Sequence, residues 1–90
     1  MNVRVAITFL GRVQGVGFRM TTRSVASGYA VAGFVRNEPD GSVLCIVEGE
    51  RAEIDRFVRA VEQAMEGCVR EKRMVESPAT GEFHGFNIRR

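Results

Sequence analysis

The 90-residue sequence has few of the residues from which metal centres, disulfide frameworks and lysine-dependent phosphate loops are built. It contains one histidine, His84, and one lysine, Lys72. A Walker loop is excluded because no lysine follows a glycine-rich segment. The two cysteines, Cys45 and Cys68, lack the spacing of a zinc or redox motif. We therefore expect two buried or half-buried free thiols in a reducing cytoplasm.

Long apolar runs and a strong charge imbalance are also absent. No segment approaches the length that crosses a membrane, and Met1–Val5 lack the apolar core of a signal peptide. The formal net charge of +2 is too small to indicate a nucleic-acid partner. The chain is 44% hydrophobic and 27% charged, as in an ordinary soluble protein. We expect a cytoplasmic monomer with one domain over residues 1–90, bound neither to membrane nor to nucleic acid.

A glycine-rich stretch, Gly11–Arg19, is the most informative segment that is present. Its three glycines free the backbone from ordinary φ limits, and a helix is expected to begin at its end. Successive N–H groups in such a loop form an anion-binding nest, which the helix dipole reinforces. Arg19 adds a permanent charge and a planar fork that matches two phosphate oxygens. This predicts a phosphate site, although a glycine-rich turn with an incidental surface arginine remains the alternative.

Two further kinds of phosphate site do not fit this loop. The dinucleotide fingerprint requires a third glycine where Met20 stands. No cluster of Asp, Glu, His or Cys lies nearby in the sequence to hold magnesium or zinc. We therefore expect backbone amides and arginine to bind the anion, with no metal and no cofactor.

A hairpin follows, with Asn37 at the end of its first strand. The segments 31–36 and 43–47 are apolar and β-branched, and Pro39-Asp40-Gly41 between them is typical of a turn. Taken by itself, Asn37 is better explained by capping a strand or by a hydrogen bond within its own turn than by a role in a site.

The hydrophobic pattern predicts an α+β fold in the order βαββαβ, with the last strand region split. Two helices would then cover one face of a mostly antiparallel sheet of four to five strands. The expected elements begin with a strand over 3–9, a helix marked by Thr22, Val25, Ala26 and Tyr29 with Gly28 as its stop, and the hairpin. A second helix is expected between Gly49-Glu50 and Gly67, with its apolar residues from Ile54 to Met65. A charged strand over 69–76 near an edge and a closing strand over 83–88 complete the pattern.

Together the two motifs resemble the acylphosphatase family. The family's first motif, Gly-x-Val-Gln-Gly-Val-x-Phe-Arg, is found at Gly11–Arg19. Its second motif begins Gly-aromatic-Val-x-Asn and is found at Gly33–Gly49, while Pro78–Ile88 is similar to the family's closing loop and strand. The resemblance covers essentially the whole chain. It implies a ferredoxin-like fold and hydrolysis of small acyl phosphates to a carboxylate and inorganic phosphate.

The same resemblance assigns roles within the predicted site. Arg19 would bind the phosphoryl oxygens, and the N–H groups of Gly15, Val16, Gly17 and Phe18 would complete the cradle. Asn37 would position the attacking water, whose proton passes to the phosphate. A carboxylate is a stable leaving group, so a site without a general acid suits this substrate.

Two other functions stay open at this point. RNA-recognition domains share the element order, but the aromatic run with which they stack bases is missing around Phe34. A carbamoyl-phosphate-handling module, found at the N-terminus of much longer hydrogenase-maturation proteins, is the nearer alternative. A chain of 90 residues favours the simple hydrolase.

The remaining polar and aromatic residues near these motifs receive structural interpretations. Gln14 holds the loop shape through backbone hydrogen bonds or touches substrate, and the sequence does not decide between the two. We expect Arg12, Arg36 and His84 at the surface and Asp40 in the turn. The aromatic residues expected in the core are Phe18, Tyr29 and Phe34. Leu44 and Ile46 would form an apolar stripe on the open face of the sheet.

Overall fold

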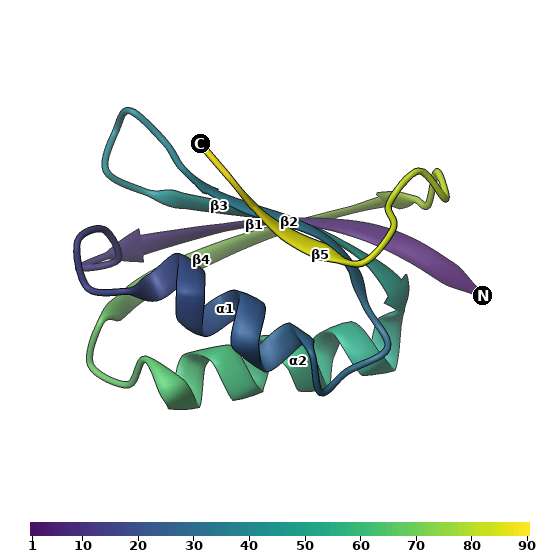
Figure 1. Ribbon diagram of the computed structural model, residues 1–90, viewed down its shortest axis with the longest axis horizontal. Helices are drawn as coiled ribbons and strands as arrows, with labels where there is room; N and C mark the ends of the chain where they lie inside the picture. Colours follow the sequence, from purple (N-terminus) through teal and green to yellow (C-terminus); the bar gives the residue numbers. More distant parts are fainter.

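A five-stranded sheet carries two helices on one of its faces and leaves the other face open (Figure 1). The computed structural model describes all 90 residues. The elements are β1 (Asn2–Gly11), α1 (Phe18–Ala26), β2 (Ala32–Asn37), β3 (Val43–Glu50), α2 (Arg51–Ala64), β4 (Val69–Pro78) and β5 (Phe86–Arg89). The strand order is β4-β1-β3-β2-β5, and every neighbouring pair is antiparallel except β2 with β5. The predicted ferredoxin-like fold is confirmed.

The core lies between the sheet and the helices, as the two hydrophobic periodicities require. Alternate residues of β1 face the helices, so that Val5, Ile7 and Phe9 are fully buried. In α2 the buried side chains recur at helical spacing: Ile54, Phe57, Val58 and Val61. Each such side chain contributes roughly 1.5–3 kcal/mol relative to an exposed position. Neither helix has the length and hydrophobicity that crossing a membrane would require.

Two predicted boundaries are wrong. The first helix ends at Ala26, and Tyr29 lies beyond it, half-buried and edge-on to Phe57 at 6.4 Å between ring centroids. The closing strand starts at Phe86 rather than at residue 83. Phe83 leaves the strand direction because its ring packs on the open face against Phe34, 5.9 Å away. The charged strand β4 does lie at an edge, as predicted.

Phe34 is buried, but outside the core that the sequence predicted for it. It lies on the open face, where the ring of Phe83 and the guanidinium group of Arg89 cover it; the latter is 4.0 Å from the ring centroid. Leu44 and Ile46 also lie on this face and are half-buried. Since successive residues of a strand alternate between faces, Val35 rather than Phe34 belongs to the helix-side core.

A group of paired charges joins the segment before β5 to the open face. This Glu48 network consists of Arg4, Glu48, Thr80, Gly81 and Glu82. Glu48 Oε2 accepts hydrogen bonds from Arg4 Nε (2.8 Å) and from the Thr80 N–H (2.9 Å), and its Oε1 accepts from the Gly81 N–H (2.9 Å). Arg4 Nη2 also donates to Thr80 Oγ1 (2.9 Å) and to Glu82. The network fixes where the chain enters β5.

The two thiols are unpaired, as predicted. Cys45 is fully buried between β1 and β2, and Cys68 is half-buried after α2. Burial raises the pKa of the Cys45 thiol, which keeps it protonated and unreactive.

Candidate active site

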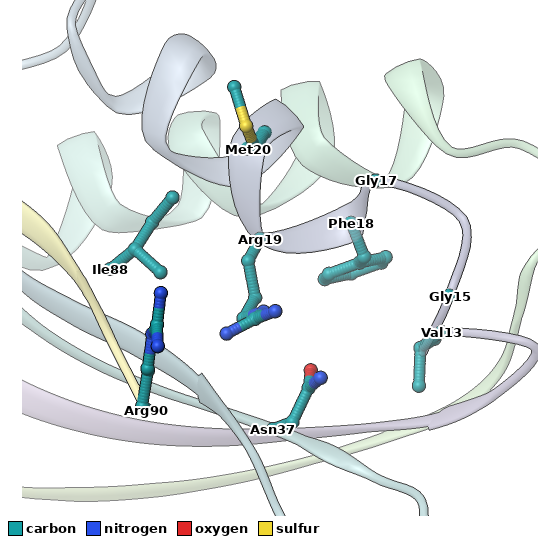
Figure 2. A pocket seen from close by; sticks show the side chains of 9 residues that line it. All are labelled: Val13, Gly15, Gly17, Phe18, Arg19, Met20, Asn37, Ile88 and Arg90. Atoms are coloured by element: carbon teal, nitrogen blue, oxygen red, sulfur yellow. The ribbon is translucent and has the colours of Figure 1, made fainter.

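A pocket of about 260 Å³ opens at the edge of the sheet where β1, β2 and β5 end (Figure 2). These three strands run in the same direction, because β1 and β2 are both antiparallel to β3 and β5 is parallel to β2. Their carboxyl ends therefore meet at one edge, beside the start of α1. The lining residues are Val13, Gly15, Gly17, Phe18, Arg19, Met20, Asn37, Ile88 and Arg90.

The glycine loop between β1 and α1 forms one wall of this pocket. Gly15 and Gly17 have φ angles of 76° and 78°, in the left-handed region that side chains with a Cβ rarely adopt. Gly17 is the N-cap of α1 and has no side chain with which to cap the helix. The first turn of α1 contains no acidic residue. The positive end of the helix dipole thus faces the pocket uncompensated.

The backbone N–H groups of the loop are not used inside the protein. Outside the helices and strands, the Arg12 N–H donates to the carbonyl of Cys68 and the Thr21 N–H donates to that of Gly17. No backbone N–H from Val13 to Met20 donates such a hydrogen bond. Such a run of free N–H groups at a helix N-terminus is suited to bind an anion.

Arg19 extends from the first turn of α1 into the middle of the pocket, and Asn37 points toward it from the end of β2 (Figure 2). Asn37 faces α1 because it alternates with Arg36 along the strand and shares the helix side with Val35. Five arginine side chains donate hydrogen bonds within the protein, namely Arg4, Arg36, Arg51, Arg56 and Arg73. Arg19 is not one of them, so its guanidinium fork is free to bind a ligand.

Gln14 braces the loop against the β2–β3 turn. Its Nε2 donates to the carbonyl oxygens of Glu38 and Ser42, both at 2.8 Å. The turn is closed by Asp40, whose carboxylate accepts from the N–H (2.9 Å) and the hydroxyl (2.6 Å) of Ser42. These two hydrogen bonds, the hydroxyl first, hold the pKa of Asp40 below its usual range. Of the two interpretations of Gln14, the structural one is confirmed by these contacts.

The structure brings together most of the predicted site residues. Five of them line the pocket: Gly15, Gly17, Phe18, Arg19 and Asn37. The side chain of Val16 does not line it and is 38% exposed, so only its backbone is available to the site. Phe18 has a second role, since its ring packs into the core 5.0 Å from that of Phe9.

Residues assigned to the surface lie away from the pocket. Arg12 and His84 are exposed, and Arg36 lies on the open face with a weak ion pair to Glu38 at 3.4 Å. None of the three lines the pocket.

Four lining residues were not predicted: Val13, Met20, Ile88 and Arg90. Met20 follows Arg19 in the helix, and its 70% exposure is unusual for a large apolar side chain. Ile88 and Arg90 come from the end of the chain. The alternation of the closing strand could have indicated that they share a face, but not that this face borders the loop.

The lining carries cations and amides but no anionic side chain. None of the nine residues is Asp, Glu, His or Cys. Nowhere in the structure do three or more residues of these types gather closely enough to hold a metal ion. The pocket is therefore arranged to attract an anion directly.

Comparison with known proteins decides the family. The sequence model of the acylphosphatase family matches residues 5–88. The chain belongs to the acylphosphatase family. It is accordingly an enzyme of the acylphosphatase class, which acts on small acyl phosphates. The element order on which the RNA-recognition alternative depended is here that of an acylphosphatase.

Individual acylphosphatases support the match over nearly the full length of the chain. An acylphosphatase from Latilactobacillus sakei is 42% identical over 90 residues, which cover 98% of each chain. The crystal structure of an acylphosphatase from Bacillus subtilis superposes with a TM-score of 0.89 at 34% identity, covering 98% of this chain and 99% of that one. A full-length HypF, solved with phosphate and nucleotide, is similar over 98% of this chain but only 12% of its own (28% identity, TM-score 0.79).

Proposed function

We propose that the protein hydrolyses the carboxyl–phosphate bond of acyl phosphates by metal-independent, in-line attack of water. One observation carries the proposal: an unpaired arginine, an amide side chain and a row of free N–H groups converge on one pocket that has no acidic or imidazole side chain. Such a pocket can bind and polarise a phosphoryl group but offers it no general acid.

The phosphoryl group would lie between Arg19 and the glycine loop. The planar fork of Arg19 reaches two of its oxygens at once. The N–H groups of Gly15, Val16, Gly17 and Phe18 face the remaining negative charge, reinforced by the dipole of α1. This charge spreads over the phosphoryl oxygens as the bond to the leaving group breaks, so the donors stabilise the transition state more than the ground state.

Asn37 would place the water opposite the leaving group. Its amide can accept a hydrogen bond from water and donate one to phosphate. The water oxygen bonds to phosphorus while the bond from phosphorus to the acyl oxygen breaks, and a carboxylate leaves. The proton of the water passes to a phosphoryl oxygen. Because a carboxylic acid has a pKa of about 4, the leaving carboxylate needs no proton.

The test is hydrolysis of benzoyl phosphate with and without excess EDTA. We expect equal rates in the two conditions and a kcat that changes little between mildly acidic and neutral pH, since no imidazole or acidic side chain lines the pocket. p-Nitrophenyl phosphate should react far more slowly, because its poorer leaving group requires a general acid. Loss of activity in EDTA that added metal restores, or a requirement for His84, would contradict the mechanism.

We also propose that the protein works as a cytoplasmic monomer without a nucleic-acid partner. All the groups assigned to the reaction come from one chain. The two unpaired cysteines suit a reducing compartment. Sedimentation at the concentration of the assay tests the oligomeric state.

A further inference from the structure

The pocket continues past Arg19 into a part that the proposed chemistry does not use. Figure 2 shows the Arg19 guanidinium between the glycine loop with Phe18 on one side and Ile88 with Arg90 on the other. Met20 lies above Arg19 on α1, with its side chain pointing away from Arg90, and is largely exposed. A phosphoryl group bound to Arg19 and the loop would leave the acyl half of the substrate on the side of Ile88 and Arg90.

The strand register explains why Arg90 faces the pocket. Ile88 lies beside Val35 and Arg89 beside Arg36 in the parallel pair of β2 and β5. The next residues are Asn37, the last residue of β2, and Arg90, one residue past the end of β5. Because side chains alternate, Ile88 and Arg90 share the helix side with Asn37, whereas Arg89 lies on the open face over Phe34.

The charge of Arg90 has no partner in the protein. Like Arg19, it is absent from the arginines that donate side-chain hydrogen bonds, and no acidic side chain lines the pocket. Two guanidinium groups thus face the same small volume with no acidic side chain between them. A substrate with one phosphoryl group neutralises Arg19 and leaves Arg90 facing the acyl group. A substrate with a second anion on its acyl group satisfies both arginines.

We propose that Arg90 is a specificity-determining residue that binds a second anionic group, a carboxylate or a phosphate, on the acyl half of the substrate. The inference rests on the proposed function, because it assumes that Arg19 holds the phosphoryl group. Ile88 forms the apolar wall along which the carbon chain between the two anions lies. The enzyme therefore prefers acyl phosphates whose acyl group is itself charged.

Matched substrates test this inference. Benzoyl phosphate and 4-methylbenzoyl phosphate have an uncharged acyl group. They are compared with 3-carboxybenzoyl and 4-carboxybenzoyl phosphate, which place a carboxylate at two distances from the phosphoryl group. We expect kcat/KM for one of the carboxylated substrates to exceed that for 4-methylbenzoyl phosphate by about tenfold, the effect of one charge-assisted hydrogen bond. In Arg90→Gln this ratio should fall to about one, and in Arg90→Lys it should be partly retained.

Arg89→Gln is the control, since it removes a neighbouring charge from the opposite face and should keep the ratio of the parent. A parent with no preference for either carboxylated substrate, or an Arg90→Gln variant that keeps the preference, would overturn the role of Arg90 while benzoyl phosphate is still hydrolysed. If the parent hydrolyses none of the four compounds, the proposed function fails and the inference fails with it.

Discussion

Arg4 at one end of the sheet is enclosed by the Glu48 network, whereas Arg19 and Arg90 at the other end face a pocket without a side-chain partner. The guanidinium group of Arg4 donates to Glu48 and Thr80 and lies 5.0 Å from the ring centroid of Phe83. The same type of side chain thus serves two purposes. Paired and packed, it stabilises the fold; unpaired at a glycine loop, it is available to a ligand.

The largest effect is expected when arginine is replaced by lysine in two single variants, one at each end of the sheet. Arg19→Lys should lower kcat/KM for benzoyl phosphate on the order of 10³-fold, because a point charge cannot replace the bidentate fork. The stability of the Arg19→Lys variant should equal that of the parent, since the Arg19 side chain makes no hydrogen bond in the free protein. Inorganic phosphate should inhibit the variant much more weakly than the parent.

The matched control is Arg4→Lys. It should show the reverse pattern, with a lower midpoint of urea unfolding and nearly parental kcat/KM in the folded protein. An Arg19→Lys variant within tenfold of the parent would remove Arg19 from the reaction, and equal losses of activity in the two variants would erase the distinction between the two ends.

Asn37→Ala should reduce kcat by about 10²-fold, because a misplaced nucleophile loses the benefit of orientation. Inhibition by inorganic phosphate should change little, since the anion is held by Arg19 and the loop. Asn87→Ala, on an exposed position of β5, is the control and should behave as the parent. If phosphate affinity and kcat fall together, Asn37 helps to bind the phosphate and does not position the attacking water.

Glu48→Gln should destabilise the protein by about 2 kcal/mol, because the buried carboxylate, 6% exposed, loses its charge against Arg4. Urea unfolding at pH 7 measures the loss. Glu71→Gln, which removes an exposed partner of Arg73, is the control and should cost less than about 1 kcal/mol. Equal losses in the two variants would show that burial adds nothing to the Glu48 network.

The pH dependence of this loss has a definite sign. Burial raises the pKa of Glu48, but hydrogen bonds from the Thr80 N–H, Arg4 and the Gly81 N–H outweigh it and lower the pKa from 4.5 to about 2. A lowered pKa stabilises the fold fully above the unfolded value of 4.5, and this contribution disappears as the pH falls toward 2. The difference in stability between the parent and Glu48→Gln should therefore shrink between pH 4.5 and 2.

The sequence predicted those parts of the molecule whose conformation depends on residues close together in the chain. The glycine loop, the turn around Asp40 and the two helices follow from backbone freedom and hydrophobic period. The same rules placed Arg19 at the start of a helix and Asn37 at the end of a strand, but only the family resemblance joined the two residues in one site. Even the charged edge strand could be identified, because β4 carries alternating charges where a central strand would be apolar.

The errors and omissions all involve partners distant in sequence. Phe83 was expected to begin the closing strand, yet it lies before the strand and packs on Phe34, which is distant in the sequence. Nothing near Glu48 in the chain indicates that Arg4 and Thr80 will enclose it. Arg90 enters the pocket through the parallel register of β5 with β2, which a periodic pattern does not specify.

The two hydrogen bonds of Gln14 have a consequence for redesigning this protein. The exposed β2–β3 turn would ordinarily be a convenient place to insert a tag or a second domain. Here the carbonyl oxygens on both sides of that turn, from Glu38 and Ser42, hold the glycine loop in position. Lengthening the turn would separate these two acceptors and release the loop.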